Sequence, residues 1–271
     1  MSRPGEEGKR LKIACQTITW GENQRMDFPS VFAASADAGY EGLEIGFRHI
    51  QSIPPAKLTE TLSEYDLRLV ATHVGGNLQD RGQASGEQQM LETVLDYLNA
   101  AGCPLLMYSG LRFENLEQFQ RDLEGILEAA EGCRRRGVQF LYHNHDWEFA
   151  DEGRIINTLL DECGPDVGFC PDIGWIAKGG ADVVDTLDRM GGRVGAVHFK
   201  DFAGPGTEVD TVMLGEGMAP LKESASWVAR HRPELWLIAE QDQASVPPKE
   251  AIEQNARFLR GLVDEVSKGT S

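Results

Sequence analysis

Eight short apolar runs alternate with longer amphipathic stretches along the whole chain, and this alternation is the strongest constraint on its fold. The runs span 11–18, 42–47, 67–74, 104–108, 138–143, 166–171, 194–199 and 235–240. Each run is short and mostly apolar, as expected for strands that are covered on both faces. The sequence therefore predicts eight buried parallel strands.

Helical periodicity fills the segments between these runs. The predicted helices span 28–38, 54–65, 86–101, 115–136, 153–163, 180–190, 219–231 and 247–266. The helix over 115–136 ends in three arginines, Arg134 to Arg136, followed by Gly137. Cations suit the negative end of a helix dipole, and glycine suits the left-handed residue that follows it. We therefore interpret the arginine run as a helix end rather than an anion site.

Eight strand–helix pairs without a long linker predict a single closed (β/α)8 barrel over 1–271, with 1–10 as a flexible N-terminal tail. The length of 271 residues fits one such barrel. The alternative is a doubly wound open sheet. That fold usually has a glycine-rich turn after its first strand, and the segment TWGENQRM has none. The long loop 200–219, rich in Gly and Pro, is expected to form a lid or rim over the site.

Charge and cysteine content exclude several classes of partner. The formal net charge is −17, which argues against a duplex nucleic acid or an anionic membrane surface as partner. The five cysteines include no CxxC pair, so no disulfide framework is expected. The chain start lacks the apolar stretch of a signal peptide and no run is long enough to span a membrane, which predicts a cytoplasmic protein. Nothing in the charge or cysteine content excludes a homo-oligomer.

Polar side chains collect at the carboxyl ends of the predicted strands, where the active site of such a barrel forms. In chain order they are Glu44, His73, His143, His145, Glu148, Asp172, His198, Lys200 and Glu240. Four of the six histidines belong to this group. The other two, His49 and His231, are expected to be ordinary loop or helix-surface residues.

Asp172, His198 and Glu240 follow three successive strands and predict a mixed oxygen–nitrogen metal site. Such donors suit Mn²⁺, Mg²⁺, Co²⁺ or Zn²⁺, and the absence of thiolates argues against a structural zinc. We expect one divalent ion, with Mn²⁺ first among these. Glu148 is the expected fourth ligand, because a second carboxylate near strand 5 would help to neutralise the ion; His143 and His145 compete for this role. The structural alternative is a buried ion-pair network.

The motifs YHNHDWEF, PDIGW, VHFKD and AEQD, in this order, resemble the xylose-isomerase-like superfamily of sugar isomerases and epimerases. Its members include inosose isomerases and dehydratases, ketose 3-epimerases and endonuclease IV. The resemblance implies a metal held by Glu, Asp, His and Glu from strands 5 to 8, and the last three match Asp172, His198 and Glu240. At strand 5 the chain has Tyr142 and His143 where epimerase-like members have a glutamate. The YHNH form is closer to the inosose dehydratase-like branch.

Proton removal next to a metal-bound carbonyl is the chemistry that such sites share. We expect His145 or His143 to act as acid or base, since imidazole titrates near neutral pH, with Glu148 as the next candidate. Lys200 is expected to stabilise an oxyanion or hold a substrate hydroxyl; a surface ion pair with Asp201 is the alternative.

The expected substrate is a small polyhydroxy ketone, without phosphate because strands 7 and 8 lack a glycine-rich phosphate loop. Glu44, His73 and Trp175 are expected to line its pocket, and Trp20 and Trp147 offer further apolar faces. Return of the proton gives an isomer or epimer of a keto sugar or inosose, the favoured outcome. Loss of a β-hydroxyl would make the protein a lyase, and a sugar-binding barrel without catalysis is a further alternative. The net charge and the small number of surplus ligands argue against a DNA-repair endonuclease.

Overall fold

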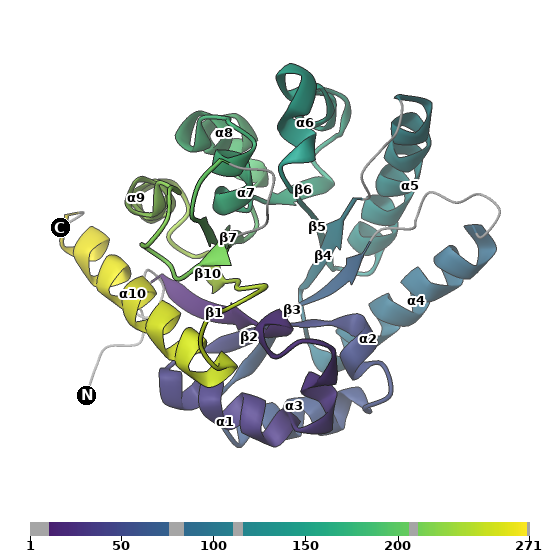
Figure 1. Ribbon diagram of the computed structural model, residues 1–271. Helices are drawn as coiled ribbons and strands as arrows, with labels where there is room; N and C mark the ends of the chain where they lie inside the picture. Colours follow the sequence, from purple (N-terminus) through teal and green to yellow (C-terminus); the bar gives the residue numbers. More distant parts are fainter. Residues whose placement is uncertain (1–10, 76–83, 111–115, 206–210, 270–271) are drawn as a thin grey trace, which may run out of the picture.

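Eight parallel strands form one sheet in the order β6-β5-β4-β3-β2-β1-β10-β7, with helices around it (Figure 1). The computed structural model describes residues 11–75, 84–110, 116–205 and 211–269. The strands of this sheet are β1 (Lys12–Gln16), β2 (Gly42–Gly46), β3 (Arg68–Gly75), β4 (Leu105–Ser109), β5 (Gln139–His143), β6 (Val167–Cys170), β7 (Val197–Phe199) and β10 (Trp236–Ala239).

The two outer strands of this order, β6 and β7, meet through two isolated parallel bridges, Phe169 with Val194 and Asp172 with His198. The backbone N–H of Gly195 donates to Phe169 at 2.9 Å, and that of His198 donates to Pro171 at 2.9 Å. The sheet is therefore a nearly closed barrel. The predicted (β/α)8 barrel is confirmed, and the open doubly wound sheet is excluded.

The helices form a ring outside the strands, and α1 and α10 lie side by side (Figure 1). Their bounds are α1 (Phe28–Ala38), α2 (Phe47–Ile50), α3 (Pro55–Ser63), α4 (Ala84–Ala101), α5 (Leu116–Arg135), α6 (Ala150–Glu162), α7 (Ile173–Lys178), α8 (Val183–Met190), α9 (Leu221–His231) and α10 (Pro248–Gly269). Short 3-10 turns are η1 (Thr17–Trp20), η2 (Glu22–Met26), η3 (Trp147–Phe149) and η4 (Gly191–Arg193). The eight predicted helices and strands are confirmed to within a few residues at each end. The short helices α2 and α7 were not predicted, because neither is long enough to show a helical period.

Each strand buries both of its faces, which explains the continuous apolar runs. On β5, Leu141 packs inside the barrel with residues such as Met107 and Ile238. The alternate residues Phe140 and Tyr142 pack in the larger core between the strands and the helices. Side chains of β5 therefore alternate between barrel interior and helix layer, whereas on β3 the consecutive residues Val70 and Ala71 both face the interior beside a register shift in the β2–β3 pairing.

The arginine run at the end of α5 pairs with carboxylates, which argues against the alternative of an anion site. Arg134 Nε lies 3.0 Å from Asp166, Arg135 pairs with Glu131, and Arg136 contacts Asp96 and Glu92. Gly137 has φ = +71°, the left-handed conformation expected after the helix.

The described part of the loop 200–219 includes a short antiparallel pair, β8 (Asp201–Phe202) with β9 (Thr211–Val212). The buried Asp201 carboxylate accepts backbone N–H groups of Phe202, Gly215, Gly217 and Ala219 at 2.9–3.0 Å. These bonds hold the loop at the rim where β7 ends; a lid movement stays a prediction. The expected N-terminal tail 1–10 lies outside the described residues. Among the helices described, none has the length and apolar character needed to cross a membrane.

Candidate metal and active site

The polar residues of the site continue the interior-facing row of each strand. His143 follows Leu141 at a spacing of two, and Glu240 follows Ile238 in the same way. Because side chains alternate along a strand, each polar residue points into the barrel one layer above the apolar interior. The barrel thus gathers side chains from distant parts of the chain at its carboxyl end.

Four of these side chains, His143, Asp172, His198 and Glu240, bring one donor atom each to within 4.8 Å of all the others. His143 Nε2 lies 3.5 Å from Asp172 Oδ2 and 3.4 Å from Glu240 Oε2. His198 Nδ1 lies 2.5 Å from Glu240 Oε2. All four residues are buried. The structure thus brings together Asp172, His198 and Glu240, as expected, with His143 as the fourth member.

The local fold engages one carboxylate oxygen of Asp172 and leaves the other facing the cluster. Its Oδ1 accepts the backbone N–H of Trp175 at 3.0 Å and so caps the N-terminus of α7. Its Oδ2 faces the cluster. The adjoining Gly174 permits this arrangement, because a Cβ there would lie 2.5 Å from the backbone oxygen of Lys200. The close approach of α7 to the end of β7 thus requires glycine.

Glu148, the fourth ligand expected from the sequence, lies outside the cluster. Its Oε1 accepts the hydroxyl of Tyr142 at 2.9 Å, and its Oε2 accepts the backbone N–H of His145 at 2.7 Å. Both carboxylate oxygens are therefore engaged in holding the turn after β5. Tyr142 points away from the barrel interior, so its partner Glu148 lies on the helix side of the strand.

Glu44 and His73, expected in the substrate pocket, lie on the opposite wall of the barrel and are connected to the cluster. Glu44 Oε2 accepts from His198 Nε2 at 2.7 Å, and Glu44 Oε1 lies 3.3 Å from His73 Nδ1. His73 Nε2 is 2.7 Å from Ser109 Oγ, and the same Oγ is 3.3 Å from His143 Nδ1. These contacts join β2, β3 and β4 to the histidines of β5 and β7.

Lys200 is buried beside the cluster. Its Nζ lies 3.0 Å from Glu240 Oε1, 2.8 Å from Asp242 Oδ2 and 3.6 Å from Asp172 Oδ2. The alternative of a surface pair between Lys200 and Asp201 is wrong, because Lys200 is buried and Asp201 accepts the backbone amides of its own loop.

Aromatic rings border the cluster on the β5–β7 side. His145 stacks on Trp147 with ring centroids 3.9 Å apart, and its ring is 5.6 Å from Trp175. Lys200 Nζ lies 5.1 Å above the ring of Trp175, which also packs on Phe202. The His145 side chain is 20% exposed, whereas His143 is 2% exposed. His145 is thus the more accessible imidazole of the pair.

Burial and mutual contact shift the pKa values of the acidic groups and the lysine. Burial opposes ionisation of Glu44, yet its contacts with His198 and His73 bring its pKa down to about 2. In the same way, Lys200 and His198 outweigh burial and hold the pKa of Glu240 well below its usual range. Burial disfavours the charged form of Lys200, but Glu240, Asp242 and Asp172 raise its pKa. Glu44 and Glu240 are therefore ionised at neutral pH, and the Lys200 ammonium keeps its proton.

The two strand 5 histidines shift in opposite directions. Burial lowers the pKa of His145, and its contact with Glu148 does not offset this. For His143, contacts with Asp172 and Glu240 outweigh burial and raise the pKa. His145 is therefore neutral and able to accept a proton at neutral pH.

The donor set fits a divalent ion. Among the described residues, the buried His143 Nε2 and Asp172 Oδ2 have no hydrogen-bond partner, although buried polar atoms are normally paired. Ligands about 2.1 Å from a tetrahedral ion lie about 3.4 Å apart, close to the separations of His143 Nε2 from its two neighbours. His198 and Glu240 share a hydrogen bond here, and such a proton is released when a metal binds.

Three site residues were missed from the sequence: Ser109, Asn144 and Asp242. Asn144 Oδ1 accepts the backbone N–H of Asp172 at 3.1 Å and so ties β5 to β6. Ser109 follows the interior residue Met107 at a spacing of two, a signal that would have found it.

The expectation that His49 is an ordinary loop or helix-surface residue is wrong, because its side chain is buried on α2.

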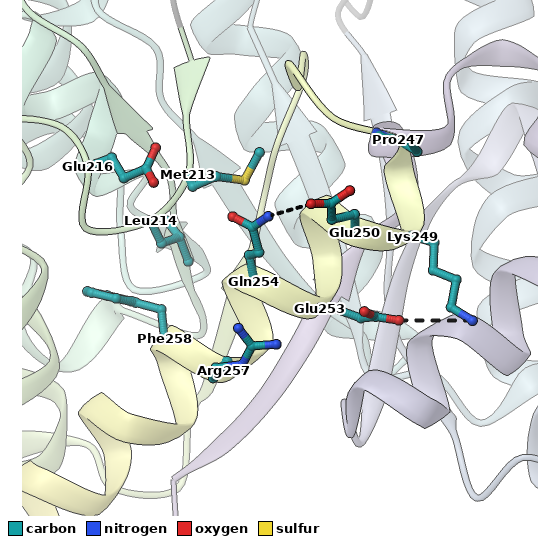
Figure 2. A pocket seen from close by; sticks show the side chains of 10 residues that line it. All are labelled: Met213, Leu214, Glu216, Pro247, Lys249, Glu250, Glu253, Gln254, Arg257 and Phe258. Atoms are coloured by element: carbon teal, nitrogen blue, oxygen red, sulfur yellow. Dashed lines mark hydrogen bonds and ion pairs between the residues drawn. The ribbon is translucent and has the colours of Figure 1, made fainter.

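A separate open pocket of about 980 Å³ lies on the outside of the barrel, along α10 and the segment that follows β9 (Figure 2). Its lining includes Met213, Glu216, Gln254 and Phe258, and none of its lining residues belongs to the four-residue cluster. Two pairs of lining side chains are in contact, Gln254 with Glu250 and Lys249 with Glu253. This pocket is therefore separate from the metal-site cluster at the barrel mouth.

The chain is similar to known sugar-processing proteins in sequence and fold. An inosose dehydratase from Geobacillus kaustophilus is 25% identical over 217 residues, covering 70% of this chain and 69% of the relative. A solved sugar phosphate isomerase/epimerase from Parabacteroides distasonis superposes with a TM-score of 0.78 at 22% identity, covering 96% of both chains. The IolI protein, solved with a bound zinc atom, has a TM-score of 0.76 at 16% identity, covering 94% of this chain and 99% of IolI.

A family model for the xylose isomerase-like TIM barrel matches residues 32–262, most of the chain. This match agrees with the resemblance of the YHNHDWEF, PDIGW, VHFKD and AEQD motifs. The chain therefore belongs to the xylose isomerase-like TIM barrel family.

Proposed function

We propose that this protein is a divalent-metal-dependent enzyme that removes a proton next to the carbonyl of a small polyhydroxy ketone. The observation that carries the proposal is the buried cluster of His143, Asp172, His198 and Glu240. Two of its donor atoms have no hydrogen-bond partner within the described part of the chain, and the neutral, partly exposed imidazole of His145 lies next to it. The sugar-processing relatives support a carbohydrate substrate.

The four cluster residues would hold the ion. It would supply Lewis-acid stabilisation of the negative charge that develops on the substrate oxygen. Their oxygen and nitrogen donors suit Mn²⁺, Mg²⁺, Co²⁺ or Zn²⁺. The zinc atom bound in the structure of IolI supports a metal-dependent enzyme on this fold.

His145 is the proposed base. Its ring is neutral, its Nδ1 lacks a hydrogen-bond partner among the described residues, and its stacking on Trp147 fixes its plane. Lys200 remains protonated and offers its N–H groups to a substrate oxygen. Trp175 contributes an apolar face next to both residues, suited to the C–H surface of a sugar ring.

Two outcomes share this first step. The relatives named inosose dehydratase favour loss of a β-hydroxyl, which makes the protein a lyase. The structural neighbour named isomerase/epimerase supports return of the proton to the substrate instead. The buried ammonium of Lys200 suits either outcome, because it can stabilise an enolate oxygen or bind a departing hydroxyl.

Incubation of the metal-loaded protein in D₂O with a panel of inososes and unphosphorylated ketoses tests the proposal. We expect deuterium at the α carbon for an isomerase or epimerase, or a new dione absorbance for a dehydratase. The Asp172→Asn variant keeps the cap of α7 but removes a charged donor, and it should show neither signal. If the loaded wild type binds a sugar but neither exchanges protons nor loses water, the protein is a sugar-binding barrel and the proposal fails.

The role of His145 has its own test. The His145→Gln variant should lower kcat by roughly 10²- to 10⁴-fold, the usual contribution of a general base, while the metal content stays unchanged. His231→Gln on α9 is the matched control, since His231 lies outside the cluster and its ring contacts Trp227 of its own helix. Equal rates for both variants would contradict the assignment of the base.

A further inference from the structure

Glu44 is fully buried at the end of β2 and is outside the four-residue cluster. Its two oxygens nevertheless face two imidazoles: Oε2 faces His198 and Oε1 faces His73. An ionised carboxylate only accepts hydrogen bonds. The nitrogen of each ring that faces Glu44 is therefore the one that carries a proton.

His198 is oriented by Glu44 directly. Its Nε2 lies 2.7 Å from Glu44 Oε2 and must carry the proton of that hydrogen bond. Its Nδ1 is the atom that faces Glu240 Oε2 in the cluster. A metal ion would release the proton that Nδ1 shares with Glu240, and because Nε2 keeps the proton that it donates to Glu44, His198 would present the Nδ1 lone pair to the ion.

His143 has the reverse orientation. Its Nε2 faces Asp172 and Glu240, whereas its Nδ1 lies 3.3 Å from Ser109 Oγ. For the Nε2 lone pair to be free, the Nδ1 must carry the proton and donate it to the serine hydroxyl.

Ser109 continues the chain of donors toward Glu44. Once its oxygen accepts from His143, its own O–H is available to His73 Nε2 at 2.7 Å. The His73 proton is then on Nδ1, the atom that lies 3.3 Å from Glu44 Oε1. Glu44 Oε1 has no hydrogen-bond partner among the described residues, so this last step of the path is an ion-pair contact between His73 and the carboxylate.

We propose that Glu44 is a positioning residue that fixes opposite tautomers on the two imidazole ligands, directly for His198 and through His73 and Ser109 for His143. The inference rests on the metal site of the proposed function. Ser109 is then also a positioning residue, because it holds the proton of His143 on Nδ1. Neither Glu44 nor Ser109 needs to touch the substrate in this role. Partners of this kind orient metal-bound histidines and raise their basicity, and their loss usually lowers metal affinity about 10- to 100-fold.

Metal affinity measured by chelator competition with Co²⁺ tests the path. Ser109→Ala removes the acceptor for His143 Nδ1 and should weaken Co²⁺ binding about 10- to 100-fold, and Ser109→Thr, which keeps the hydroxyl, should restore it. Ser35→Ala is the matched control, because Ser35 is also buried and its hydroxyl donates within α1, to the Val31 carbonyl at 2.8 Å. The control should bind Co²⁺ as the wild type does.

Glu44→Gln should weaken binding more than Ser109→Ala, because it removes the negative charge that faces both His198 and His73 and replaces one acceptor oxygen with an NH2 donor. The Ser109→Ala substitution should have little further effect in the Glu44→Gln background, since Ser109 acts through the same carboxylate. Additive losses would contradict a shared path.

The tautomers themselves can be read by ¹⁵N NMR of histidine-labelled, Zn²⁺-loaded wild type, which requires no variant to fold. We expect an N–H on Nδ1 of His143 and on Nε2 of His198. Identical tautomers, or wild-type affinity in both Ser109→Ala and Glu44→Gln, would overturn this inference alone. A wild type that binds neither Co²⁺ nor Zn²⁺ would overturn the metal site of the proposed function and the inference with it.

Discussion

The ammonium of Lys200 and the carboxylate of Glu240 lie 3.0 Å apart inside the barrel mouth, and both side chains are buried. The same ammonium is 2.8 Å from Asp242. Lys200 thus contributes the positive charge of its ammonium to a group of buried carboxylates. Its removal leaves those charges without compensation, which is costly in a protein interior.

The Lys200→Met variant, which keeps the length of the side chain, should therefore lower the free energy of unfolding of the metal-free protein by about 3–5 kcal/mol. Urea unfolding monitored by circular dichroism measures this. Lys57→Met is the control, because Lys57 pairs with Glu60 on the exposed face of α3 at 2.8 Å. Its unfolding midpoint should stay close to that of the wild type. Equal midpoints for the two variants would show that Lys200 is not part of a buried charge network.

Two glycine-to-alanine substitutions should change stability in opposite directions. Gly174→Ala places a methyl group 2.5 Å from the backbone oxygen of Lys200, and we expect a loss of about 1–3 kcal/mol. Gly261→Ala, within α10, meets no atom within 4 Å and should gain about 0.5–1 kcal/mol through helix propensity. Differential scanning calorimetry distinguishes the two. A neutral Gly174→Ala would contradict the close packing of α7 on β7.

Variants of Glu148 and His143 test which of the two residues near the end of β5 is a metal ligand. Because both of its oxygens are engaged by Tyr142 and the His145 backbone, Glu148→Gln should retain one metal ion per chain, whereas His143→Ala should lose it. Metal analysis after dialysis against Mn²⁺ gives the stoichiometry. Loss of the ion from Glu148→Gln with retention in His143→Ala would restore the ligand expected from the sequence.

The cysteines should be unreactive in the folded protein. All five are free and buried, and burial raises the pKa of Cys103 to about 12 and that of Cys163 to about 11. Only the thiolate reacts with a disulfide reagent, so labelling at pH 8 should be slow in the native state and complete in concentrated guanidinium chloride.

The raised thiol pKa values also determine how the stability of the folded protein depends on pH. A raised thiol pKa means that the folded state holds its proton more tightly than the unfolded state. The contribution of the buried thiols to the free energy of unfolding is therefore full below the ordinary thiol pKa of about 9 and is lost as the pH rises toward 11 or 12. Native labelling should accelerate about tenfold per pH unit in this range. Rapid labelling of any cysteine at pH 8 would contradict the burial described here.

The sequence predicts the barrel well because its constraints are local and repeated. Strands buried on both faces give continuous apolar runs, and the helices between them have a clear period. Helix α7 escapes this reasoning because it is too short for a period and begins only because Asp172 caps it. Closure between β6 and β7 depends on two bridges that no local pattern reveals.

The site is predictable in position and less so in detail. Residues at strand ends identify the barrel mouth, but the fourth cluster member depends on which face of β5 a side chain occupies. His143 lies two residues after Leu141 and so faces the barrel interior as Leu141 does. Glu148 lies beyond the end of the strand, and its carboxylate accepts the hydroxyl of Tyr142 on the other face of β5. The contacts of Glu44 with His198 join residues 154 positions apart, a distance over which spacing carries no information.

The central claim is that His143, Asp172, His198 and Glu240 hold one divalent ion. A crystal structure of Co²⁺- or Zn²⁺-loaded protein with anomalous diffraction data measured at the metal edge tests it most directly. We predict one anomalous peak within about 2.0–2.3 Å of His143 Nε2, Asp172 Oδ2, His198 Nδ1 and a Glu240 oxygen. A fully loaded crystal with no peak among these atoms, or with the peak at Glu148 in place of His143, would contradict the account.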